Sequence, residues 1–129
     1  MKRTFLIVFC LFLSLSYGFA QEKAVATFVK ITHDFSEIQE TGGDVSTDFV
    51  VKNTGKTPLV INRVTASCGC TTPDWTKAPI APGKTGLIKA TYSPKGRPGP
   101  FSKSITVYTN AVEPSSILVI KGDVLMAEK

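Results

Sequence analysis

The residues best suited to chemistry are two cysteines one position apart, Cys68-Gly69-Cys70. They can bond to each other, because Gly69 permits the sharp turn that brings two Cα atoms within the roughly 4.4–6.8 Å of a disulfide. A bridge that closes so small a loop gains little from chain entropy and is easily reduced, so a labile thiol-redox pair is an alternative. In a third interpretation the two small side chains only shape a turn.

Thiolates also favour copper(I) and zinc, so a soft-metal site is a further alternative. Zinc takes about four ligands. The residues that could assist the cysteines are His33, Asp34 and Asp74, and none of them has a ligand spacing. We therefore expect no metal site and no cofactor.

His33 is the only histidine, and a general base needs a nucleophile and an orienting acid. Cys68 or Cys70 with His33 and Asp34 is the one conceivable set. Asp34 directly follows His33, and neighbouring side chains on a strand point to opposite faces, so Asp34 is badly placed to orient the imidazole. We expect no enzyme, and a histidine ring hydrogen-bonded to a nearby backbone group.

The segment after the cysteines carries the candidate partner-binding residues, Thr71, Asp74 and Trp75. Trp75 has two interpretations. It caps the open end of the domain, with its indole N–H bound to a loop carbonyl, or it is an exposed anchor for a partner.

The N-terminus predicts export. Lys2 and Arg3 precede an apolar run over residues 5–13, and the following residues are smaller and more polar. This is typical of a secretory signal peptide, here residues 1–20, cleaved between Ala20 and Gln21. An uncleaved anchor is the alternative, but the segment is shorter than the roughly 20 apolar residues that span a bilayer. We expect a periplasmic or extracellular protein with no membrane span after signal removal.

Removing 20 of the 129 residues leaves 109, enough for one domain over residues 21–129. Removing Lys2 and Arg3 lowers the formal net charge from +5 to +3. The remaining basic residues are spread singly, apart from Lys95-Gly96-Arg97, which reads as a hairpin tip. A nucleic-acid partner would need a clustered basic stripe, so we expect none.

The mature chain has the pattern of an all-β domain. Apolar residues alternate with period 2, and all 8 Pro and 9 of the 10 Gly lie after residue 20. About seven strands follow, with an irregular stretch over residues 67–83, and they predict an immunoglobulin-like antiparallel β-sandwich. The expected strands cover residues 24–32, 33–38, 45–53, 59–65, 85–93, 101–109 and 117–125.

The alternation also predicts a core and two special glycines. We expect Val25, Val29 and Ile31 to face inward, Gly55 to adopt a positive φ in a tight turn, and Gly122 to mark a bulge. The predicted core comprises Phe49, Ile61, Ile88, Tyr92, Ile105, Val107, Val119 and Val124.

Three motifs together resemble a family of uncharacterised domains in exported bacterial proteins. They are His33-Asp34-Phe35-Ser36-Glu37-Ile38, the run from Ala66 through Cys68-Gly69-Cys70-Thr71-Thr72-Pro73 to Trp75, and Pro79-Ile80 followed by Pro82-Gly83. That family is similar to immunoglobulin-like folds of the major-sperm-protein and ASH (abnormal-spindle/hydin) type. Ser36 stands where the family usually has Gly. The resemblance covers about the whole mature chain and implies the fold, but no activity.

These observations predict an exported, non-catalytic domain that serves as a binding or structural module of the cell envelope. Its expected partner is a protein or another envelope component, held by an edge strand through strand addition or by the segment from Cys68 to Trp75. The alternative is a thiol-redox or copper-handling protein that uses Cys68 and Cys70.

Overall fold

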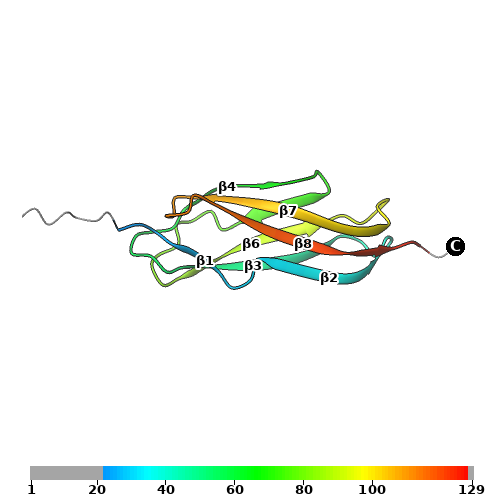
Figure 1. The fold of residues 1–129 in the computed structure, drawn as a ribbon, viewed down its shortest axis with the longest axis horizontal. Coiled ribbons are helices and arrows are strands. Elements are labelled where there is room, and N and C mark those ends of the chain that lie inside the picture. Colours follow the sequence, from blue (N-terminus) through cyan, green and yellow to red (C-terminus); the bar gives the residue numbers. More distant parts are fainter. Residues whose placement is uncertain (1–21, 128–129) are drawn as a thin grey trace, which may run out of the picture.

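The computed structural model describes residues 22–127, which form eight strands in two stacked four-stranded sheets (Figure 1). One sheet has the order β1-β3-β6-β5 and the other β2-β8-β7-β4. The described residues contain no helix, and therefore none long and apolar enough to cross a membrane. The predicted β-sandwich is thus confirmed, whereas Ala20, Gln21 and the predicted signal peptide lie outside the described residues. The strands are β1 (Ala26–Phe28), β2 (Thr32–Gln39), β3 (Val45–Asn53), β4 (Ile61–Ala66), β5 (Thr71–Trp75), β6 (Thr85–Tyr92), β7 (Gly99–Thr109) and β8 (Ser115–Leu125).

An eighth strand, β5, lies inside the stretch predicted to be irregular. It pairs antiparallel with β6 and has no neighbour on its other side. Pro73 sits at its centre, and proline cannot donate to a ladder hydrogen bond. An edge strand tolerates proline where the missing N–H would face solvent, which is the arrangement here.

The first predicted strand is wrong, because the chain changes sheets within it. β1 ends at Phe28, and the chain then crosses to the other sheet, where β2 begins. Val25, Val29 and Ile31 are exposed, Val29 to 77%, whereas Phe28 packs against the core. Carrying one alternation through a crossover assigns side chains to the wrong face.

The predicted antiparallel pairing holds except at β2, which runs parallel to β8. The predicted bulge is also misplaced. The β7–β8 register is continuous through Gly122, whereas the register of β2 shifts between Asp34 and Glu37. Ser36 has a φ of +59° at this shift. That conformation favours glycine, which accounts for the Gly that the resembling family usually carries there.

The core lies between the two sheets and contains seven of the eight predicted residues. Val119 is the exception: it is half-buried, while Leu118 and Ile120 are fully buried. Without a bulge in β8, residues 118, 120, 122 and 124 share one face, and Val119 points the other way. Gly122 is needed for packing, because a Cβ there would lie 2.9 Å from the ring of Phe101.

The turn after β3 is built by a buried amide. The Asn53 side chain donates to the carbonyls of Thr57 (2.7 Å) and Ile80 (2.9 Å) and accepts from the N–H of Gly55 (3.0 Å). The prediction of a positive φ at Gly55 is wrong. Glycine is required there for close approach instead, since a Cβ would overlap the backbone of Lys23 and Ala24.

Candidate functional site

The Cys68-Gly69-Cys70 segment is the turn that carries the chain from one sheet to the other. It joins β4 of the β2-β8-β7-β4 sheet to β5 of the β1-β3-β6-β5 sheet. The two cysteines form a disulfide, with Cα atoms 5.3 Å apart. Both ends of the turn are hydrogen-bonded to inner strands: the N–H of Ser67 donates to the Ser104 carbonyl, and the N–H of Ser93 to the Cys70 carbonyl, each at 2.9 Å.

The two sulfurs have different surroundings. Cys70 belongs to the core, with 7% of its surface exposed, whereas Cys68 is half-buried. The N–H of Cys70 points at the Cys68 sulfur (3.3 Å). The Thr71 hydroxyl lies 3.8 Å from the Cys68 sulfur and 4.0 Å from the Cys70 sulfur. Each sulfur therefore has a polar hydrogen within reach, and Cys68 is the more exposed of the two residues.

The three candidate partner-binding residues all lie on β5, at different depths. Thr71 is buried (4% exposed), so its side chain lies beneath the surface. Asp74 faces solvent, with 77% of its side chain exposed. Trp75 is half-buried and packs against the core. The accessible members of the predicted set are therefore Asp74 and Trp75.

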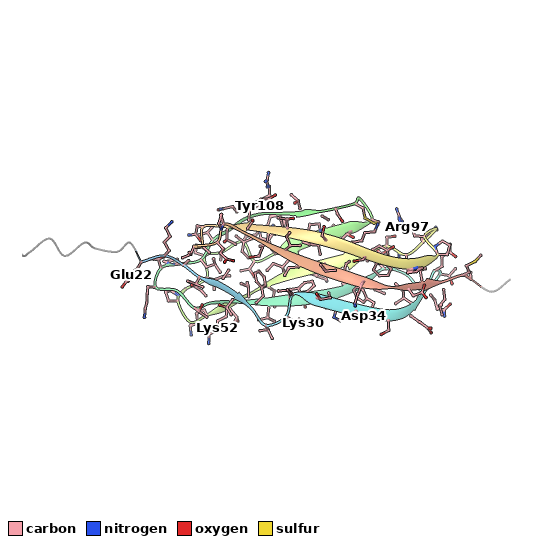
Figure 2. All side chains as sticks on the ribbon, in the orientation of Figure 1. Glu22, Lys30, Asp34, Lys52, Arg97 and Tyr108 are labelled. Carbon is pink, nitrogen blue, oxygen red and sulfur yellow. A yellow bond between two sulfur atoms is a disulfide. The ribbon has the colours of Figure 1, made fainter. Side chains whose placement is uncertain are left out.

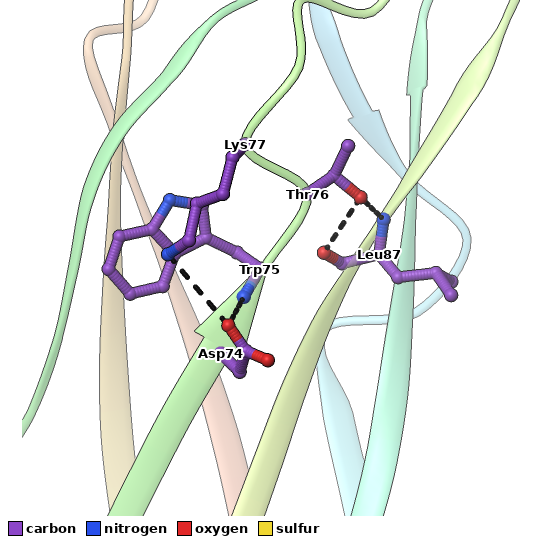
Figure 3. Close-up of polar contacts among 5 residues, drawn as sticks. All are labelled: Asp74, Trp75, Thr76, Lys77 and Leu87. Carbon is purple, nitrogen blue, oxygen red and sulfur yellow. Dashed lines mark hydrogen bonds and ion pairs between the residues drawn. The ribbon is translucent and has the colours of Figure 1, made fainter.

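Lys77 joins these two residues into one arrangement, which we name the Asp74–Lys77 cluster (Asp74, Trp75 and Lys77; Figure 3). The Lys77 Nζ lies 3.0 Å from the centroid of the Trp75 ring and 3.8 Å from Asp74 Oδ1. The same oxygen accepts the backbone N–H of Trp75 (2.9 Å). Because both charged groups are exposed, the ion pair contributes little stability. The cluster presents an aromatic ring with a carboxylate and an ammonium group beside it.

A shallow groove of about 360 Å³ adjoins the cluster. Asp48 of β3 and Leu87 and Lys89 of β6 line it together with Asp74, Trp75 and Thr76. The Thr76 hydroxyl accepts the N–H of Leu87 at 3.0 Å and so fixes the rim to β6 (Figure 3). Asp48, Leu87 and Lys89 could not be linked to Asp74 from the sequence, because they lie on other strands. Lys77 could have been found from the sequence, because it is a basic residue three positions after the acidic Asp74.

The hydrogen bonds of β5 show which of its backbone groups face the free edge. The N–H of Ser93 donates to the Cys70 carbonyl, and the N–H of Thr76 donates to the Leu87 carbonyl. Since the hydrogen-bonded pairs of an antiparallel ladder recur every second residue, the even-numbered residues of β5 face β6. The odd-numbered residues direct their backbone groups outward.

None of the three outward-facing residues of β5 has a free backbone N–H to offer a new strand. The N–H of Thr71 donates to the Cys68 carbonyl (3.3 Å), and that of Trp75 to Asp74 Oδ1 (2.9 Å). Pro73 has no N–H. A strand added here would find no free donor, so β5 is a protected edge.

His33 lies on β2, at the opposite edge of its sheet from β4, where the cysteine turn begins. The conceivable catalytic set is therefore not assembled. The ring packs edge-on against Phe35 (centroids 4.6 Å apart). Its Nδ1 accepts from the Lys30 ammonium at 2.7 Å, so the predicted backbone partner is wrong for this nitrogen. Asp34 Oδ1 instead accepts the N–H of Ser36 (2.8 Å).

The surroundings of His33 disfavour its charged form. Partial burial lowers the pKa of His33 below 6.5, the Lys30 charge lowers it further, and Asp34 opposes both. Lys30 and Asp34 lie at the solvent-facing margin of β2 (Figure 2). Among residues 22–127 no three His, Cys, Asp or Glu side chains are grouped to hold a metal ion.

The family described as "Protein of unknown function (DUF1573)" matches residues 26–124. No match exists among curated proteins. A protein of unknown function from Porphyromonas gingivalis W83 has a similar structure, with 18% identity and a TM-score of 0.67 over 78% of this chain and 46% of that one. The chain thus spans about half the length of that relative.

Two further structures share the fold at lower identity. The secreted serine protease VesC from Vibrio cholerae is 9% identical, with a TM-score of 0.59 over 81% of this chain and 24% of that one. The YadV chaperone is 13% identical, with a TM-score of 0.50 over 82% of this chain and 53% of that one. At these identities the similarity concerns the fold alone.

Proposed function

This chain belongs to the DUF1573 family of proteins of unknown function, and we propose that it is an exported, non-catalytic immunoglobulin-like module that binds an envelope partner through the Asp74–Lys77 cluster. The observation that carries the proposal is Trp75 itself. Trp75 packs against the core, the Lys77 ammonium lies over its ring, and Asp74 is exposed beside it. Preorganised aromatic anchors lose little conformational entropy on binding.

Three features support binding rather than turnover. His33 and the cysteine turn lie at opposite edges of one sheet. The cysteines are joined to each other, so neither is a free nucleophile. The groove beside the cluster is lined by Asp48, Asp74 and Lys89 around apolar Leu87, a mixture of groups that suits a polar protein surface with one apolar contact.

The closed donor side of β5 favours the cluster over strand addition at this edge. A partner pairing with β5 would gain few main-chain hydrogen bonds. A partner covering the cluster would instead bury the Trp75 ring and meet one negative and one positive charge. We also propose the major-sperm-protein or ASH type for the fold, supported by the motif from Ala66 to Trp75.

The binding site is tested by photocrosslinking in intact cells. A photoreactive amino acid replaces Lys77 in one variant and the exposed Lys121 of β8 in a control. We expect a discrete adduct from position 77, none from position 121, and loss of the adduct in Trp75→Ala but not in Trp75→Phe. Equal labelling from both positions, or none from 77, would reject the cluster as the binding site.

Export is tested separately by fractionation and intact mass. We expect the protein outside the cytoplasm, with Gln21 as its first residue. A cytoplasmic protein that retains residues 1–20 would reject export while leaving the binding surface open to the crosslinking test.

A further inference from the structure

We propose that the Cys68–Cys70 disulfide is a thiol-exchange site at which an external low-molecular-weight thiol attacks the Cys68 sulfur. This reactivity goes beyond the proposed binding function, since it involves none of the residues of the Asp74–Lys77 cluster. It is a stoichiometric modification of the β4–β5 turn.

Accessibility selects the sulfur that is attacked. An attacking thiolate must reach one sulfur of the bond while the other leaves. Cys70 is 7% exposed and belongs to the core, whereas Cys68 is half-buried. The neighbouring Gly69 is open, because a Cβ placed there would meet nothing within 4 Å. Approach from solvent is therefore directed to Cys68.

Thr71 supplies a hydrogen-bond donor to the departing sulfur. When the incoming sulfur bonds to Cys68, the S–S bond breaks and Cys70 leaves as a thiolate. The buried Thr71 hydroxyl lies 3.8 Å from the Cys68 sulfur and 4.0 Å from the Cys70 sulfur, so it can turn to the Cys70 sulfur once Cys68 is bonded to the incoming thiol. A donor close to a thiolate stabilises it, and a more stable leaving thiolate departs faster. The Cys70 thiolate then takes a proton from solvent.

A second thiol completes the reaction with balanced electrons. It attacks the external sulfur of the mixed disulfide and releases the reduced Cys68 thiol. Overall, two external thiols are oxidised to one disulfide, and the protein disulfide gains two electrons and two protons.

Two features favour exchange without unfolding. The bond joins residues only two positions apart, so it gains little stability from closing a loop. The ends of the turn are held independently of the bond, by the hydrogen bonds Ser67–Ser104 and Ser93–Cys70. The turn can therefore lose the bond while both sheets keep it in place.

The direction of attack is tested in the full mature protein with glutathione. The folded wild type is treated with reduced glutathione, quenched with an alkylating reagent and mapped by mass spectrometry. We expect glutathione on Cys68 and the alkyl group on Cys70. Glutathione mainly on Cys70, or a bond that is reduced only when the protein unfolds, would overturn the proposal.

Matched single variants give a second measurement. Cys70→Ser leaves Cys68 as a free thiol, and Cys68→Ser leaves Cys70, each treated with oxidised glutathione below its unfolding transition. We expect the mixed disulfide to form about tenfold faster or more at Cys68, because exposure governs access to a thiol. Equal rates, or a faster reaction at Cys70, would contradict the proposed selectivity.

Thr71→Val tests the assisting hydroxyl, since valine keeps the shape and removes the donor. We expect reduction of the wild-type bond to be slowed severalfold, with glutathione still found on Cys68. An unchanged rate would remove Thr71 from the mechanism.

Discussion

At the scale of single residues, two turn glycines differ in the space that each leaves for a side chain. A Cβ on Gly55 would overlap the Lys23 carbonyl oxygen and lie 2.7 Å from the carbonyl carbon of Ala24, whereas one on Gly69 meets nothing within 4 Å. We expect Gly55→Ala to lower the free energy of unfolding by about 1–3 kcal/mol through overpacking. Gly69→Ala is the matched control and should change it little. Urea denaturation of both variants checks this, and equal losses would contradict it.

The single histidine allows a pH prediction at the same scale. Burial and Lys30 lower the pKa of His33 in the folded protein below 6.5, its value when unfolded. Between these two pKa values the unfolded chain binds more protons, so stability rises with pH through this window and is lost as pH falls through it. We expect an NMR titration midpoint below 6.5 that rises in Lys30→Gln. A midpoint above 6.5 would show that the Asp34 charge dominates.

At the scale of elements, Pro73 protects the free edge of β5. Its backbone nitrogen faces outward and carries no hydrogen, and the two flanking outward N–H groups are already bonded. Pro73→Thr supplies one donor at the centre of the edge, so we expect increased self-association by edge pairing. Sedimentation at rising concentration measures this. Thr72→Val, which changes an exposed side chain and keeps the backbone donors unchanged, is the control.

Single strands differ in how well the sequence predicts them. The alternation in residues 45–53 predicted β3 with its observed bounds, because both faces of that strand are regular. The same reasoning failed over residues 24–32 and 67–83. There a chain crossing between sheets and an edge position decide the outcome, and neither leaves a local pattern.

At the scale of the whole molecule, the two sheets are held together by the apolar layer between them. Phe49 lies in this layer with no exposed surface. We expect Phe49→Ala to lower the free energy of unfolding by about 3–5 kcal/mol, because it leaves a cavity that the sheets cannot close. Ile117→Ala, at an exposed position of β8, should change it by about 0.5 kcal/mol or less. An unchanged thermal midpoint for Phe49→Ala would contradict the assigned core.

Much of the architecture follows from local patterns in the amino-acid order. Period-2 alternation and the clustering of Gly and Pro indicated a sandwich, and the predicted core residues are buried except for Val119. The cysteine spacing permitted the disulfide that the structure contains. These features depend on near neighbours, so a linear reading can find them.

Other features depend on long-range packing. The parallel pairing of β2 with β8, the protected edge of β5 and the bulge at Ser36 arise when distant segments meet. The groove beside the Asp74–Lys77 cluster likewise combines β3, β5 and β6. Alternation tells which side chains of a strand share a face, but it carries no information about which strand lies alongside. Only the folded chain settles that choice, because the burial free energy of the complete core selects the neighbours.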